Sequence, residues 1–136
     1  MKKLNNFINC LNVLKTANFD QAYEDPIYRS GVTFQFNLTF ELAWKATQAI
    51  MLSDGAPAET GSPREILMLA YKLGYIDGEN VWITMLKRRN EAVHIYDEDR
   101  IDELMLLIKD SFIPAFEALA QTLKAKLAQI GEEETL

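Results

Sequence analysis

Apolar side chains recur at every third or fourth position along most of this chain, and strictly alternating runs are nearly absent. That spacing is typical of amphipathic helices rather than of strands. One apolar stripe, from Leu4 to Ala17, predicts a first helix over residues 3–23. This helix should end near Asp25-Pro26, because a residue that precedes proline is pushed out of helical geometry.

A second helix is predicted over residues 28–52, and its composition sets it apart. Its apolar positions cover well over half of the circumference, which is more than a helix with one solvent-facing side needs. We therefore expect this helix to lie at the centre of the fold or to be shared with a second subunit. Turn-forming residues at 53–61 then make the one long loop.

Three further helices follow this loop. Ser62-Pro63-Arg64-Glu65 has the spacing of a capping box with proline at the first helical position, so a helix should begin there. A fourth helix should open at Asp77 or Gly78 and a fifth around residues 97–99, with a kink at Pro114. The three predicted ranges are 63–73, from 77 or 78 to about 90, and from about 97 to 130.

The pattern therefore predicts an all-α protein, an up-and-down bundle of about five helices. Residues 1–130 would form a single domain and 131–136 a flexible acidic tail. Length and composition agree with one soluble domain, since 136 residues are 49% hydrophobic and 25% charged. No apolar run reaches the roughly 18 residues of a membrane span, and asparagines interrupt the N-terminal segment, so we expect a cytoplasmic protein without membrane contact.

The chain contains a single cysteine, Cys10, and a single histidine, His94. These counts exclude an internal disulfide and a Cys/His zinc cluster within one chain, so no metal or other cofactor is predicted. The net charge of -6 argues against broad attraction to nucleic acid, DNA included, but leaves room for a local basic site.

The stretch from Lys87 to Arg100, KRRNEAVHIYDEDR, joins a basic cluster to the only histidine. In a regular helix Asn90 and His94 share a face, whereas Arg89 and His94 lie about 140° apart. A bend near His94, or a second copy of the helix, would bring an arginine and the histidine to one phosphate. Imidazole exchanges protons near neutral pH, and guanidinium stabilises charge that develops on a phosphoryl group.

Each of these residues also has a purely structural explanation. A lone histidine at the end of an amphipathic helix is usually a packing residue. Lys87, Arg88 and Arg89 would counter the dipole at a helix C-terminus, and Tyr96 would be an ordinary amphipathic residue at a helix junction. Periodicity and composition alone therefore lead only to a soluble helical bundle.

Motifs in the chain extend this interpretation. RNEAVHIY, from Arg89 to Tyr96, resembles the Arg-x4-His-x-Tyr signature of the HEPN superfamily, including the asparagine after the arginine. A narrower likeness, over residues 3–125, is to the bacterial branch called nucleotidyltransferase substrate-binding proteins. The blocks that resemble this branch are FQFNLTFELAWK at 34–45, Ser62-Pro63-Arg64, and Trp82 and Met85 ahead of the motif.

The resemblance implies a HEPN-like bundle that forms a homodimer, with two Arg-x4-His motifs facing across a shared cleft. It also implies a partner, a small and separately encoded nucleotidyltransferase. HEPN toxins of toxin-antitoxin pairs are metal-independent endoribonucleases, so the cleft would hold RNA. By position, Arg89 and His94 would be catalytic, Asn90 would be a polar helper, and the nucleotidyltransferase could adenylylate Tyr96.

The alternative is a non-catalytic subunit that presents a nucleotide or another substrate to the nucleotidyltransferase. Lys87 and Arg88 would then join the motif in a phosphate-binding cradle. The acidic composition fits a small ligand better than long RNA, and Glu91 places a negative charge beside the site. Glu41 and Lys45, four residues apart, could pair with each other or reach the cleft, and the sequence leaves this open.

Overall fold

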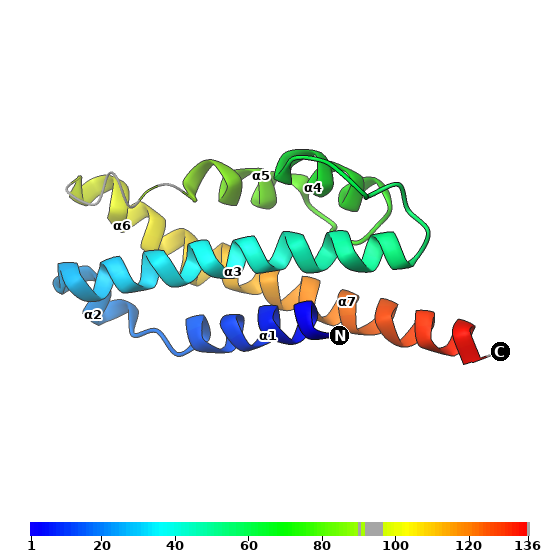
Figure 1. Ribbon diagram of the computed structural model, residues 1–136. Helices are drawn as coiled ribbons and strands as arrows, with labels where there is room; N and C mark the ends of the chain where they lie inside the picture. The colour runs from blue at the N-terminus through cyan, green and yellow to red at the C-terminus, as the bar shows by residue number, and fades with distance from the viewer. Residues whose placement is uncertain (90, 92–96, 136) are drawn as a thin grey trace.

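The computed structural model describes residues 1–89, 91 and 97–135, and within this part every regular element is helical. The all-α prediction is confirmed. The elements are α1 (Lys2–Lys15), α2 (Phe19–Glu24), α3 (Pro26–Ser53), α4 (Pro63–Lys72), α5 (Glu79–Arg88), α6 (Glu98–Leu107), a π-helical turn (Ile108–Phe112) and α7 (Ile113–Thr135) (Figure 1).

Helix α3 is the central element of an up-and-down bundle. It runs the length of the molecule, with α1 and α2 along one side and α4 and α5 along the other, and it contacts α7 as well (Figure 1). The predicted central position of this helix is confirmed. No helix in the described part of the chain is long and apolar enough to cross a membrane.

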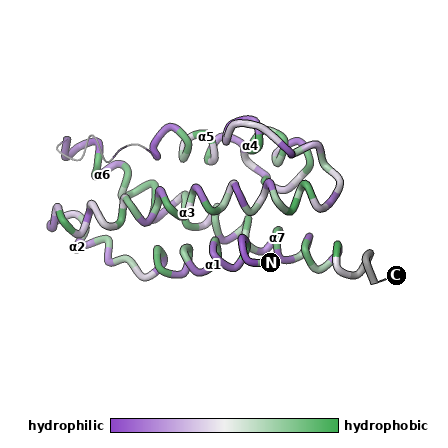
Figure 2. The backbone as a smooth tube through the Cα atoms, in the orientation of Figure 1, coloured by the Kyte–Doolittle hydropathy of each residue, from purple (hydrophilic) through white to green (hydrophobic). Residues whose placement is uncertain are grey.

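Aromatic rings from several helices fill the core. Phe36 of α3 stacks on Phe112 with ring centroids 5.1 Å apart, and Trp82 of α5 meets Phe116 of α7 edge-on at 5.5 Å. Phe7 of α1 lies against the same Phe116 at 6.1 Å. Apolar and polar positions alternate around each helix, as the colours of Figure 2 show. The Trp82 contact fixes α5 on the core, and thereby fixes where the basic C-terminal end of α5 lies.

The first predicted helix is in fact two helices, which corrects the expected range of 3–23. Helix α1 ends at Lys15, and α2 begins after Asn18, whose side chain accepts a hydrogen bond from the Gln21 backbone at 3.1 Å. The backbone N–H of Asn18 donates to the Tyr28 hydroxyl at 2.8 Å. Asparagine is a preferred N-cap, so it starts a new helix here rather than continuing the old one.

Two other helix starts follow the sequence closely. The capping box of α4 is confirmed, because Ser62 and Glu65 each accept a hydrogen bond from the other's backbone N–H at 3.2 Å. Helix α6 begins at Glu98, directly after its N-cap Asp97, whose side chain accepts a hydrogen bond from the Arg100 backbone N–H. Short-range capping chemistry explains both positions.

The kink expected at Pro114 takes the form of a π-helical turn just ahead of it. Ile113 N–H donates to the carbonyl of Ile108, five residues back, before α7 continues through Pro114. Proline lacks an N–H and displaces the preceding turn, and a widened turn absorbs that strain. Helix α7 then extends to Thr135, so the backbone of 131–135 is helical where the sequence predicts a frayed tail.

Candidate functional site

The structure places the basic half of the predicted site at the end of α5. Lys87 and Arg88 are the last two residues of α5, and Arg89 is its C-cap in helical geometry. The other three predicted residues, Asn90, His94 and Tyr96, lie outside the described residues. Their roles therefore stay predictions. The part of the site that the structure shows consists of the basic residues at the end of α5 and the carboxylates that contact them.

Arg89 is tied to the central helix by one carboxylate. Its Nη1 lies 3.2 Å from Oε1 of Glu41 on α3, and Oε2 of Glu41 accepts a hydrogen bond from the Trp44 indole at 3.1 Å. The indole fixes the carboxylate, and the carboxylate then orients the guanidinium. Both charged side chains are partly exposed, so solvent reaches Arg89 from the side that Glu41 leaves open.

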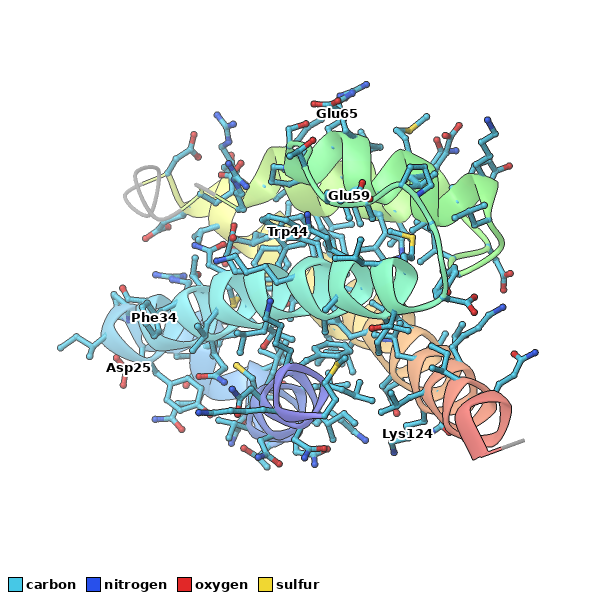
Figure 3. The ribbon with its side chains drawn as sticks, turned by 45° about the vertical axis from the view of Figure 1, so that its right-hand side comes forward. Asp25, Phe34, Trp44, Glu59, Glu65 and Lys124 are labelled. Atoms are coloured by element: carbon cyan, nitrogen blue, oxygen red, sulfur yellow. The ribbon has the colours of Figure 1, made fainter. Side chains whose placement is uncertain are left out.

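The question of Glu41 and Lys45 is thus answered by the structure. Glu41 points to Arg89 rather than to Lys45, and the Lys45 ammonium lies 5.8 Å from the centre of the Trp44 ring. Figure 3 labels Trp44 on α3 and shows it facing the side of α4 and α5. One indole therefore contacts both a lysine and the glutamate that holds Arg89, 48 residues further along the chain.

Arg88 is engaged differently from Arg89. It forms a short ion pair with Glu103 of α6, and its Nη1 lies 3.9 Å from Oε1 of Glu91. Glu91 is almost fully buried, at 2% exposure, and Oε2 lies 2.9 Å from Nε of Arg100. A phosphate would have to compete with these carboxylates for Arg88, which makes Arg88 the less accessible of the two arginines.

Glu91 is therefore not a free negative charge beside the site. It is compensated by Arg88 on α5 and by Arg100 on α6, on either side of the segment 92–96. Only the Arg88–Glu91 pair, three residues apart, has a spacing that sequence alone could have suggested. The Glu91–Arg100 and Arg88–Glu103 contacts cross between elements and have no local signal.

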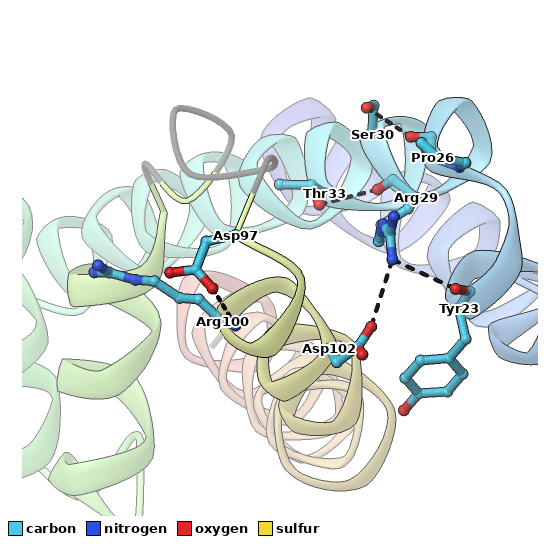
Figure 4. A network of polar contacts seen from close by, with 8 residues as sticks. All are labelled: Tyr23, Pro26, Arg29, Ser30, Thr33, Asp97, Arg100 and Asp102. Atoms are coloured by element: carbon cyan, nitrogen blue, oxygen red, sulfur yellow. Dashed lines mark hydrogen bonds and ion pairs between the residues drawn. The ribbon is translucent and has the colours of Figure 1, made fainter.

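Another ion pair holds the start of α6 to α3, whereas the Arg88–Glu103 pair holds it to α5. Buried Arg29 of α3 contacts Asp102 of α6 and the carbonyl of Tyr23, both at 3.4 Å (Figure 4). Burial raises the pKa of the Tyr23 hydroxyl, and the nearby Asp102, Asp110 and Asp20 carboxylates raise it further. The first two turns of α6 are thus held to α3 by Asp102 and to α5 by Glu103.

The local charge is nearly balanced. Lys87, Arg88, Arg89 and Arg100 face Glu41, Glu91 and Glu103 at this end of the fold. Lys87 is exposed and makes no ion pair within the described residues. Because the C-terminal end of a helix carries negative partial charge, α5 itself adds nothing that attracts an anion. Any anion would have to be bound by individual side chains, above all Arg89 and Lys87.

Among the residues that the structure describes, no group of three or more histidine, cysteine or acidic side chains is arranged to hold a metal ion.

The family model described as "Nucleotidyltransferase substrate binding protein like" matches residues 2–125. The chain belongs to this family. Membership confirms the resemblance given by the three sequence blocks and links this substrate-binding-like protein to a nucleotidyltransferase. No curated protein matches the sequence.

Proposed function

We propose that this protein is the substrate-binding subunit of a separately encoded nucleotidyltransferase and that Arg89 contacts a phosphate group of a nucleotide. The observation that carries the proposal is the Glu41–Arg89 contact in a chain of this family. A guanidinium has five N–H donors, and Glu41 engages one nitrogen of Arg89, so donors remain for a ligand.

The arrangement suits a fixed, directional contact with an anion. An arginine whose position is already set by a carboxylate loses less conformational entropy when it binds, which favours affinity. Arginine can donate two parallel hydrogen bonds to a phosphate, whereas lysine acts as a point charge. Lys87, two residues before Arg89 and exposed, lies about 200° from it around α5, so we assign Lys87 to a more distant part of the ligand.

The balance of charge favours a small ligand over long RNA. Affinity for a nucleic acid backbone depends on many unpaired cations, because each one releases counterions from the phosphates. Here three of the four cations at the site are already paired, and the whole chain carries a net charge of -6. A nucleotide needs only one or two phosphate contacts, which the remaining donors of Arg89 can supply.

Titration of the purified protein with ATP by calorimetry tests this proposal. Saturable binding that is lost in Arg89→Ala and weakened about tenfold or more in Arg89→Lys is the expected result, since lysine keeps the charge but not the paired donors. Lys109→Ala, which removes an exposed cation from the π-helical turn, is the matched control and should bind normally. Equal binding by Arg89→Ala and Lys109→Ala would refute the proposal.

A second function, a metal-independent endoribonuclease toxin of the HEPN type, is favoured by the Arg89–His94 spacing. His94 would take the proton of a ribose 2′-hydroxyl, and the oxygen would attack the adjacent phosphate. The bond from phosphorus to the 5′-oxygen would break and that oxygen would take up the proton that His94 holds, leaving a 2′,3′-cyclic phosphate and a 5′-hydroxyl. Arg89 would stabilise the charge on the pentacovalent phosphorus, with Asn90 as a polar helper. Adenylylation of Tyr96 by the nucleotidyltransferase would then neutralise the toxin.

RNA incubated with the partner-free protein in excess EDTA separates the two functions. Cleavage that disappears in His94→Ala and in Arg89→Ala, with both variants still folded, would establish the nuclease. Intact RNA together with ATP binding that depends on Arg89 would establish the substrate-binding subunit. In either case we propose a homodimer as the working form.

A further inference from the structure

Trp44 lies at the edge of the core without another ring against it. The chain has two tryptophans, and Trp82 is the core one, 2% exposed and in ring contact with Phe40 and Phe116. Trp44 is only partly buried, on the side of α3 that faces α4 and α5 (Figure 3). Within the described part of the chain no other aromatic ring packs on it. An indole placed in this way is a candidate contact for a ligand.

One face of the Trp44 ring can be reached from solvent. The indole N–H lies in the plane of the ring, so its 3.1 Å hydrogen bond to Glu41 uses an edge of the ring and leaves the faces uncovered. The ammonium of Lys45, an exposed residue, lies 5.8 Å from the ring centre. A cation over an exposed ring is held weakly and can be displaced. Lys45 therefore marks a ring face that a ligand can occupy.

The Trp44 ring and the Arg89 guanidinium are close enough to contact one small ligand. Glu41 bridges them, with Oε1 3.2 Å from Nη1 of Arg89 and Oε2 3.1 Å from the indole nitrogen. Their separation is thus no more than two hydrogen bonds and the width of one carboxylate group. In a nucleotide the base and the phosphates are separated by a similar span, because the ribose lies between them. Arg89 and Trp44 can therefore contact the two ends of the same nucleotide.

We propose that Trp44 is the platform on which the base of a purine nucleotide stacks while Arg89 binds the phosphates. Stacking on an aromatic side chain is open to every base, because each base has a π face, and a purine offers the larger face. No hydrogen bond to an edge of the base is needed. This inference rests on the proposed function and adds to it the residue that would recognise the base.

The charges around Trp44 favour the same orientation of the ligand. Glu41 would repel a phosphate placed beside the indole, whereas a neutral base can lie next to a carboxylate. Arg89 contacts the other oxygen of Glu41, and its unused N–H donors attract the phosphates. Glu41 thus separates the base end of the site from the phosphate end, and it is a positioning residue for both Trp44 and Arg89.

Calorimetry with ATP and with tripolyphosphate measures what the base adds. Tripolyphosphate has no base, so wild type should bind ATP about tenfold or more tightly, which is the effect expected for one stacked base. Trp44→Leu should lose most of this preference, and Trp44→Phe, which keeps an aromatic ring, should retain it. Both variants lack the indole N–H, so an effect that passes through Glu41 is the same in both. Equal binding of the two probes by wild type, or an unchanged preference in Trp44→Leu, would overturn the proposal.

A comparison of ATP with UTP tests the preference for a purine. Wild type should bind ATP several-fold more tightly than UTP, because stacking is stronger for the larger base. Trp44→Leu should bind the two alike. Tighter binding of UTP than of ATP by wild type would exclude a purine platform.

Intrinsic fluorescence tests the contact itself. A base stacked on Trp44 should quench its emission, and the buried Trp82 is a reference within the same molecule. Saturating ATP should therefore quench part of the emission of wild type and none of the emission of Trp44→Phe, in which only Trp82 remains. Quenching that persists in Trp44→Phe, or a wild type that binds ATP without quenching, would refute stacking on Trp44.

The Arg89→Ala variant keeps this inference apart from the proposed function. If Arg89→Ala loses ATP and Trp44→Leu loses the preference for ATP over tripolyphosphate, both proposals stand. If ATP binding depends on Arg89 but Trp44→Leu keeps that preference, only the base platform fails. If Arg89→Ala binds ATP as wild type does while Trp44→Leu loses the preference, the platform stands and the phosphate contact of Arg89 fails.

Discussion

Replacement of the buried Glu91 by glutamine should destabilise the protein by about 2 kcal/mol. Its carboxylate is 2% exposed and carries the charge that balances two guanidinium groups. Arg100 Nε donates a hydrogen bond to Oε1 at 3.2 Å, while Oε2 lies closer, at 2.9 Å, but without hydrogen-bond alignment. Arg88 is 3.9 Å away, so its attraction to Glu91 is Coulombic. Glutamine keeps the shape of the side chain and removes its charge.

The size of the effect follows from what happens to the two cations. Removal of one member of a fully buried ion pair costs about 3–5 kcal/mol, because the other charge is left buried alone. Arg100 is 47% exposed and can turn toward water, and Arg88 keeps its pair with Glu103. Both effects reduce the loss, which gives about 2 kcal/mol rather than the full range.

Urea unfolding at neutral pH measures this effect, and Glu103→Gln is the control. Glu103 contacts the same Arg88 but is 60% exposed, so its loss should cost less than about 1 kcal/mol. The comparison uses the midpoint of unfolding at an unchanged slope with urea, which reports stability alone. If Glu91→Gln costs no more than Glu103→Gln, the buried carboxylate does not stabilise the junction of α5 and α6, and the reasoning fails.

Three further changes have defined outcomes. Burial and a 3.1 Å hydrogen bond to Asp54 raise the pKa of Tyr75 to about 12. The contribution of this tyrosine to the free energy of unfolding is therefore complete below pH 10 and is lost as the pH rises through about 12. In Tyr75→Phe, the free energy of unfolding should depend less on pH in that window. Ser62→Ala breaks the capping box of α4 and should cost about 1 kcal/mol in urea unfolding, whereas Ser30→Ala should cost less. Phe116→Ala should cost about 3–5 kcal/mol by the same measurement, because its ring contacts Phe7, Phe36 and Trp82.

Features that depend on neighbouring residues could be predicted from the sequence. The capping box at Ser62 and the start of α6 at Asp97 are short-range signals, and both are found where expected. The break between α1 and α2 has a local signal in Asn18, since asparagine is among the best N-caps. The apolar stripe continues through Ala17, however, and by itself predicts one unbroken helix.

The contacts of the site cannot be predicted from one sequence, because they join residues that are far apart along the chain. Glu41 and Arg89 are 48 residues apart, and no periodicity connects them. Their meeting depends on how α5 is placed on α3 by Trp82 and the core rings, which is a property of the whole bundle. The sequence indicates both residues as candidates, Arg89 through its motif and Glu41 through its spacing from Lys45. Only the packing of the helices shows that Glu41 and Arg89 form an ion pair.

The composition of α3 has two separate causes. Phe36, Phe40 and Ala43 are buried in the bundle and account for one apolar face. They do not account for Ile27, Phe34 and Leu38, which lie on the other face and stay 85%, 67% and 39% exposed in the single chain. A monomer would be expected to carry polar residues there, since exposed apolar patches favour association. The excess hydrophobicity in the sequence of α3 therefore has two parts, one that the core of the bundle explains and one that the single chain leaves exposed.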